Sequence, residues 1–143
     1  NWSDSLFEGA NFRKAFLRGV MVPGVVLTGV DFRDTELIIQ LDGVDLSGLD
    51  FRGAQFTCDS SAAGACLDGA DLRKASVDEL DLTGASLKGA DVRNVDFCEA
   101  TVDGMSLAGA KVAGAQFWED QIAKVDVTGV VGRLVIRPVP PGG

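Results

Sequence analysis

Carboxylates recur at a fixed spacing in the C-terminal half of this 143-residue sequence. Glu79, Glu99 and Glu119 follow one another at intervals of 20 residues. Neither lysine nor arginine occurs in the stretches around them, 75–84, 95–104 and 115–123. Carboxylates without nearby cations indicate a docking surface for a basic protein partner, and a solvated face of an acidic protein is the alternative interpretation. The residues predicted for this surface are Asp78, Glu79, Asp81, Asp96, Glu99, Asp103, Trp118 and Glu119.

A second charged pattern runs through the first two thirds of the chain. Its basic members are Arg13, Arg33, Arg52, Arg73 and Arg93, and two places before them stand Asn11, Asp31, Asp50, Asp71 and Asp91. Alternating charges at one spacing predict an ion-pair ladder that fixes register and solubility, because exposed pairs each contribute less than about 1 kcal/mol. A guanidinium stripe for a phosphate or carboxylate ligand is the alternative, and the interleaved aspartates argue against it because they would repel that ligand.

Residues for enzymatic chemistry are scarce. The chain has no histidine and no phosphate-binding loop of the GxxxxGK type, and exposed carboxylates lack the burial that acid–base catalysis requires. We therefore expect no enzyme activity, no cofactor and no metal. The three cysteines, Cys58, Cys66 and Cys98, have no metal-binding spacing and are expected to be free thiols, with Cys98 facing outward below Trp118.

The element that positions these side chains is a five-residue repeat. Each block has a small residue, a polar residue, a large apolar residue at its centre and two polar or glycine residues, as in Ala70–Lys74. A period of five fits neither a helix nor a flat strand, but it fits a chain that turns a corner in every block and keeps each centre inside. Equivalent positions also recur about every 20 residues, which predicts four blocks in one coil.

These Ala-(Asp/Asn)-Leu/Phe blocks resemble the pentapeptide-repeat family, over nearly the whole chain. The resemblance implies an all-β fold, a right-handed quadrilateral parallel β-helix of about six to seven coils at a spacing of roughly 4.8 Å. Residues 1–129 are expected to form this solenoid, with 1–6 as an N-terminal cap that includes Trp2. Residues 130–143 are expected to form a capping strand and a Pro/Gly tail.

Three irregularities interrupt the count. The earlier block centres, including Val22, follow the five-residue period. One residue is then missing between the centres Leu37 and Leu41. The extra residue in 59–64 is expected to bulge from a corner as a loop. Near the C-terminus the register fails at Asp120 and Gly132, and the apolar stretch 130–136 indicates a strand that covers the last coil. A homodimer through this edge is the alternative interpretation.

Composition bounds the function. The net charge is −8 and no apolar run is long enough to span a membrane, so we expect a protein partner and no direct nucleic-acid binding. A cytoplasmic location is favoured, and an organelle lumen is the alternative if an N-terminal targeting segment was removed. The pattern predicts a non-catalytic scaffold or protein-interaction module. The alternative implied by the family resemblance is a DNA mimic that binds a topoisomerase such as DNA gyrase.

Overall fold

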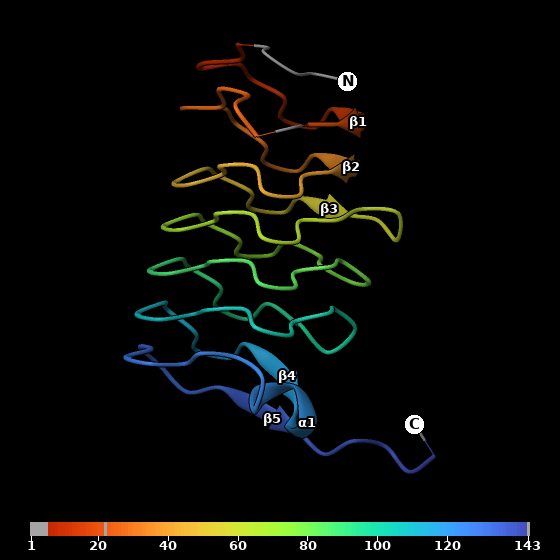
Figure 1. Ribbon diagram of the computed structural model, residues 1–143, viewed down its shortest axis with the longest axis vertical. Helices are drawn as coiled ribbons and strands as arrows, with labels where there is room; N and C mark the ends of the chain where they lie inside the picture. The colour runs from red at the N-terminus through yellow and green to blue at the C-terminus, as the bar shows by residue number, and fades with distance from the viewer. Residues whose placement is uncertain (1–5, 22, 143) are drawn as a thin grey trace.

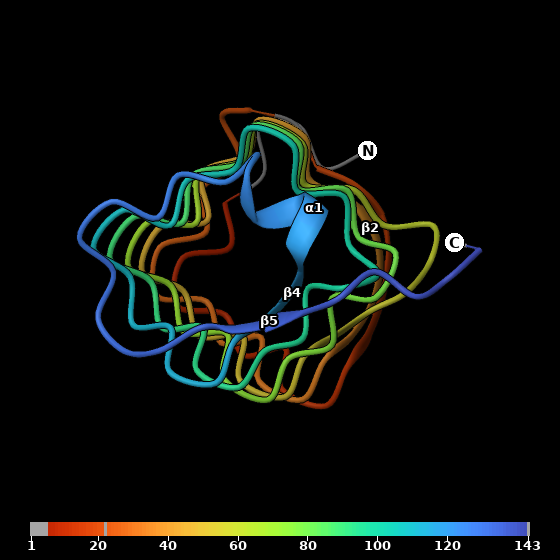
Figure 2. The same cartoon turned by 90° about the horizontal axis from the view of Figure 1, so that it is seen from below.

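The chain winds into stacked turns that lie almost directly over one another (Figures 1 and 2). The computed structural model describes residues 6–21 and 23–142. Its strands are β1 (Phe16–Val20), β2 (Glu36–Gln40), β3 (Gln55–Phe56), β4 (Gln116–Trp118) and β5 (Val135–Arg137), and its helix is α1 (Glu119–Ile122). They form two parallel sheets, in the orders β1-β2-β3 and β4-β5. Isolated parallel bridges join the remaining blocks of successive turns. Predicted residue 2 and the predicted centre at 22 lie outside the described residues.

Each block makes two kinds of backbone hydrogen bond. The first kind closes the turn at the end of a block, as where Ala15 N donates to Phe12 O at 2.9 Å. The second kind joins neighbouring coils, because the backbone N–H of a block centre donates to a carbonyl of the next coil, as from Phe12 N to Asp31 O at 2.9 Å. The third residue of this turn, Lys14, has φ 60°, the left-handed conformation that a type II turn requires there. The turn therefore bends the chain every five residues, and the bonds between coils keep equivalent residues stacked.

The block centres fill the interior. The rings of Phe32 and Phe51 stack with centroids 5.0 Å apart, and those of Phe97 and Phe117 with centroids 4.8 Å apart. Ala54 and Ala70, both 0% exposed, occupy small positions between the large side chains. Alternating large and small residues let a narrow interior reach the density of an ordinary protein core.

One side of the solenoid is a straight strand without a turn in two successive coils, as β1 and then β2. In β2 the side chains of Leu37 and Ile39 both point into the core, and Leu41 is the next buried residue. This side therefore has one residue fewer than a regular five-residue block. This strand accounts for the missing residue in the count. β1 pairs with β2 over its whole length and has the same straight form, which places Met21, 2% exposed, in the core. Met21 is therefore a buried residue of this side, and the predicted centre at 22 is not among the residues that the structure describes.

The predicted loop over 59–64 is wrong. Ser60 and Ala62 are 4% and 1% exposed, and Ser61 pairs with Gln40 on one side and with Asp81 on the other. The extra residue is absorbed earlier, at the turn of Thr57–Asp59, which projects from the solenoid (Figure 2). Ser60 remains inside because its hydroxyl donates to Leu37 O at 2.9 Å and accepts from Ile39 N at 3.1 Å.

At the C-terminal end the chain crosses beneath the last coil as α1 (Figure 2). The Gln121 side chain faces the coil above, and its Nε2 lies 3.0 Å from Phe97 O, 3.1 Å from Cys98 O and 3.0 Å from Ala100 O. Its Oε1 accepts from Trp118 N at 2.8 Å. One amide thus bonds backbone carbonyls at the corner where α1 replaces a regular block, before the backbone bonds between coils resume at Lys124. Asp120 and Gly132, where the register was predicted to fail, are exposed.

We expect Gln121→Ala to lower the free energy of unfolding by about 1–3 kcal/mol, because it leaves covered backbone carbonyls without donors. Chemical denaturation followed by circular dichroism measures this change. Gln116→Ala is the matched control, since the Gln116 side chain makes no hydrogen bond within the described residues. Equal losses for both variants would contradict a specific role for the Gln121 amide.

Candidate functional site

The predicted acidic side lies on stacked corners of the C-terminal half. Glu79 N donates to Glu99 O at 3.2 Å, so these two residues occupy equivalent corners of adjacent coils, and both are exposed. Glu79 is also left-handed, with φ 60°, as its place in the turn requires. Glu119 opens α1 and is exposed as well. The flanking aspartates are half-buried or exposed.

The expectation that this side has no local cations is wrong for two of its aspartates. Arg137 Nη1 lies 3.6 Å from Asp96 Oδ2, and Lys124 Nζ lies 3.4 Å from Asp103 Oδ1. Arg137 reaches Asp96 because β5 pairs with β4, a contact between distant segments that local sequence does not reveal. Among the residues that the structure describes, Asp78, Glu79, Asp81, Glu99 and Glu119 make no ion pair.

The aromatic and thiol groups of this side are more covered than predicted. The Arg137 guanidinium lies 4.6 Å from the centre of the Trp118 ring, which is half-buried beneath it. Cys98 is 6% exposed and does not face outward. Burial raises the pKa of its thiol to about 11, with the neighbouring Asp96 adding to the shift. Cys58, Cys66 and Cys98 are all free, as predicted.

The arginines and aspartates of the second pattern form a continuous ladder of ion pairs along the solenoid. We call this ladder the staircase, and one arginine with the residue two places before it is one rung. Arg33 Nη2 donates to Asp31 Oδ2 at 2.7 Å and its Nε to Asp31 Oδ1 at 3.0 Å. Arg33 Nε also lies 3.8 Å from Asp50 Oδ2 of the next coil. The same paired contact repeats in the three later coils, for Arg52 with Asp50, Arg73 with Asp71 and Arg93 with Asp91. Asp50, Asp71 and Asp91 therefore each lie between guanidinium groups of two coils.

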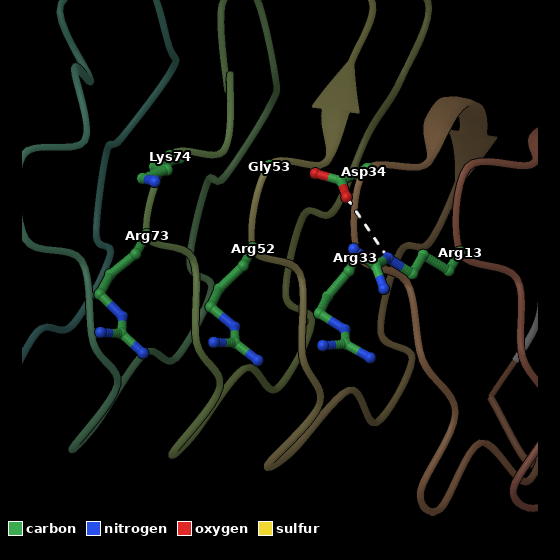
Figure 3. A pocket seen from close by; sticks show the side chains of 7 residues that line it. All are labelled: Arg13, Arg33, Asp34, Arg52, Gly53, Arg73 and Lys74. Atoms are coloured by element: carbon green, nitrogen blue, oxygen red, sulfur yellow. Dashed lines mark ion pairs between the residues drawn. The ribbon is translucent and has the colours of Figure 1, made fainter.

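The first rung differs because residue 11 is asparagine. Without a carboxylate two places earlier, Arg13 Nε turns toward Asp34 Oδ2, 3.5 Å away (Figure 3). In the regular rungs the hydrogen bonds from Arg33 hold the pKa of Asp31 at about 2, below its usual value of 3.8. The hydrogen bond from Arg93 likewise lowers the pKa of Asp91.

A surface hollow of about 330 Å³ lies beside this staircase (Figure 3). We call it the arginine groove, and its lining residues are Arg13, Arg33, Asp34, Arg52, Gly53, Arg73 and Lys74. Figure 3 shows the guanidinium groups of Arg33, Arg52 and Arg73 side by side and extended in one direction. A second hollow of about 320 Å³, lined by Arg73, Lys74, Arg93 and Asn94, continues it along the axis.

Sequence reasoning placed the arginines in one row but missed the groove and its contributors Asp34, Gly53 and Lys74. Each of these residues directly follows the arginine of its coil, so the 20-residue spacing of the sequence already placed them in one row beside the arginines. What the sequence did not reveal is that the Asp34 side chain extends over Gly53, which has no side chain of its own. A Cβ at Gly53 would lie only 2.3 Å from Asp34 Oδ1.

The wall that carries the groove differs in charge from the rest of the molecule. We define this arginine wall as the blocks 10–14, 30–34, 49–53, 70–74, 90–94 and 110–114. It contains eight basic and five acidic residues and therefore has a net charge of +3. Because the whole chain carries −8, the remaining residues together carry −11. The molecule therefore presents one basic wall on an otherwise acidic body.

Comparison with known proteins agrees with the repeat geometry. A family model for pentapeptide repeats matches residues 65–104 with eight copies. A solved pentapeptide repeat protein from the thylakoid lumen of Arabidopsis thaliana is 32% identical, with a TM-score of 0.53. The chain belongs to the pentapeptide-repeat family. The match covers 69% of this pentapeptide-repeat protein and 62% of the Arabidopsis one. A search of curated proteins found no match.

Two further solved structures share the β-helix solenoid fold of this pentapeptide-repeat protein. A pentapeptide repeat protein from the cyanobacterium Cyanothece has a TM-score of 0.69 at 16% identity, over 77% of this chain and 89% of its own. QnrB1, a plasmid-mediated fluoroquinolone resistance protein, has a TM-score of 0.52 at 15% identity, over 92% of this chain and 82% of its own. Such low identity supports the shared fold alone. In the described part of this chain, no helix is long and apolar enough to cross a membrane.

The staircase predicts a dependence of stability on acid. Because the pKa of Asp31 is about 2 in the folded protein and 3.8 in the reference state, its ionised form favours folding above about pH 4. That contribution disappears as the pH falls through about 2. We expect Asp31→Asn to reduce the loss of unfolding free energy between pH 5 and pH 2, measured by denaturant titration. Asp59→Asn is the control, and an equal pH slope in both variants would contradict the prediction.

Proposed function

We propose that this pentapeptide-repeat protein is a non-catalytic scaffold that binds a basic protein partner through its acidic side. The proposal includes the finer geometry that the sequence predicts, a right-handed quadrilateral winding of six to seven coils over 1–129 and a cap over 130–143. The observation that carries it is a set of exposed carboxylates, Glu79, Glu99 and Glu119, that make no ion pair within the described residues.

The stacking of these groups has an energetic consequence. Two carboxylates one coil apart, at roughly 4.8 Å, repel by about 0.9 kcal/mol even in bulk water. The distance is shorter than the Debye length of about 8 Å at physiological salt, so ions do not remove the repulsion. A basic partner would relieve it, and relief on binding favours the complex over the free protein.

The packed interior supports a non-catalytic role. The block centres are buried hydrophobic side chains from Leu27 to Phe117, and the largest of them are less than 2% exposed. The candidate carboxylates Glu79 and Glu99 lie on the outside, where solvent weakens the environmental tuning that acid–base catalysis requires. A rigid rod with chemically distinct sides is better suited to docking than to enclosing a substrate.

DNA mimicry is the weaker alternative for this chain. A duplex carries about one charge per 1.7 Å of its axis on all sides. Here the arginine wall interrupts the acidic surface with a net charge of +3. Similarity to QnrB1 supports the fold, and its 15% identity gives no residue-level argument for a shared partner.

A homodimer through the C-terminal end also receives less support than a heterologous partner. The Gln121 amide already bonds carbonyls of the last coil, and β5 covers the edge of β4. The strand edge that these contacts leave for a second copy, within the described residues, is the outer edge of the three-residue strand β5. For location, the cytoplasm remains our proposal from the free thiols, and the lumenal origin of the Arabidopsis relative supports the alternative of an organelle lumen.

We expect the triple variant Glu79→Lys, Glu99→Lys, Glu119→Lys to lose binding to a fluorescent oligolysine peptide and to a basic partner recovered by pull-down. The reason is the replacement of attraction by repulsion on one side. Fluorescence anisotropy at low and physiological salt measures the first, and an expected loss of at least about tenfold in affinity corresponds to about 1.4 kcal/mol.

The matched control changes the same number of charges elsewhere, at Glu8, Glu36 and Asp59, which are all exposed. Both triple variants move the net charge equally. If the control loses oligolysine binding as strongly as the acidic-side variant, overall charge rather than the acidic side explains the binding. Unchanged partner recovery by the acidic-side variant would likewise refute the proposed surface.

We expect the wild-type protein not to inhibit supercoiling of DNA by gyrase, because its basic wall breaks the uniform charge of a duplex. A gel assay of plasmid supercoiling with increasing protein measures this. Inhibition that weakens steeply with added salt would favour the DNA-mimic alternative over the scaffold.

A further inference from the structure

We propose that the arginine groove binds a small multivalent oxyanion, a molecule with two or three carboxylate or phosphate groups about 5 Å apart. This site lies on a different wall from the acidic side and does not depend on the scaffold proposal. Its ligand would lie along the solenoid axis and bridge the guanidinium groups of Arg33, Arg52 and Arg73.

The donors for such a ligand are present and unused. Arg33, Arg52 and Arg73 each bond their aspartate through Nε and Nη2. Within the described residues the Nη1 of these three arginines makes no hydrogen bond. Because the aspartate holds one edge of each guanidinium, the remaining edge is fixed in direction, as the parallel groups in Figure 3 show. A ligand would therefore meet donors that are already oriented, which lowers the entropy lost on binding.

The aspartate row does not repel such a ligand as strongly as the sequence suggested. Asp31, Asp50 and Asp71 do not line the groove, and each carboxylate is covered by hydrogen bonds from its own arginine. Asp50 and Asp71 also lie 3.8 Å and 3.7 Å from the Nε of the arginine one coil earlier. The acidic residue in the lining is Asp34, and it is paired with Arg13.

The shape of the groove selects a small ligand. Its volume of about 330 Å³ lies at the low end of the roughly 300–1,000 Å³ typical of small-molecule sites. Gly53 lies in the lining between Asp34 and Lys74 of the neighbouring coils, and the Asp34 carboxylate extends over it. The period of the arginines is close to the roughly 4.8 Å strand spacing. The terminal phosphates of a tripolyphosphate, or two carboxylates of a short polycarboxylate, can reach two neighbouring arginines of this period, whereas directly linked phosphates lie closer together.

The charge distribution argues against a long polyanion. The arginine wall carries a net +3, whereas the rest of the chain carries −11. A duplex or a long acidic chain that extended past the wall would meet this negative field, while a molecule confined to the groove would not. The structure thus favours a compact anion over nucleic acid.

Isothermal titration calorimetry with citrate and with tripolyphosphate, at physiological ionic strength where the Debye length is about 8 Å, tests the proposal on the wild-type protein. We expect saturable one-to-one binding of at least one probe, with Arg52→Gln weakening it about tenfold or more by removing the central donor. Gly53→Asn should weaken it similarly by filling the hollow, since asparagine tolerates the left-handed conformation of this position (φ 73°).

Matched controls come from the same wall. Lys111→Gln removes a cation of the same wall that lines neither hollow, and Gly114→Asn adds a side chain at an equivalent corner, φ 77°, next to Asn94. Both should change the affinity by no more than about twofold, because the lost or added group lies away from the ligand. Thermal unfolding of all four variants checks that the fold is retained.

Each outcome decides the proposal. Binding of citrate alone identifies a polycarboxylate, and binding of tripolyphosphate alone identifies an oligophosphate; either supports it when the groove variants weaken binding and the controls do not. Absence of saturable binding of both probes at millimolar concentration overturns it. Equal weakening by the control variants also overturns it, as does binding of a 20-base-pair DNA duplex (a length of about 68 Å) without binding of the small anions.

Discussion

Backbone hydrogen bonds between successive coils hold every other feature of this molecule in place. They run from each block centre to the residue about one coil later, as from Phe51 N to Asp71 O at 2.8 Å. The turn within each block then determines which side chain is inside, since only the centre and the small residue point toward the axis. Buried phenylalanine stacks such as Phe32 on Phe51 follow from this register rather than from any sequence-local preference.

The same register places like residues directly above one another on the outer surface. The arginine wall and the acidic side differ in how the stacked charges are compensated. On the arginine wall each guanidinium alternates with a carboxylate, as in Arg33, which contacts Asp31 of its own coil and Asp50 of the next. On the acidic side Glu79 stacks on Glu99 with no cation between them. The first arrangement fixes the direction of side chains, and the second leaves a repulsion that binding would relieve.

Departures from the five-residue repeat change the local geometry of the solenoid. The straight strands β1 and β2 replace a turn and shorten one side, and the adjacent coil compensates with an extra residue at Thr57–Asp59. The position of Ser60 inside depends on those strands, because its hydroxyl bonds Leu37 and Ile39 of β2. At the other end, a single side-chain amide of Gln121 in α1 replaces the backbone donors that a regular block would supply at this corner.

The five-residue period by itself determined the repeat family, the parallel stacking near 20 residues, the buried centres and the row of arginines. These follow because one short turn, repeated, leaves the chain a single way to bury its apolar residues. Tertiary structure decided what depends on distant partners. Arg137 covers Trp118 and reaches Asp96 only because β5 pairs with β4, and Met21 and Ser60 are buried because one side is straight in two successive coils. The lining of the groove likewise combines Asp34, Gly53 and Lys74 of neighbouring coils, a relation among three coils that no single block contains.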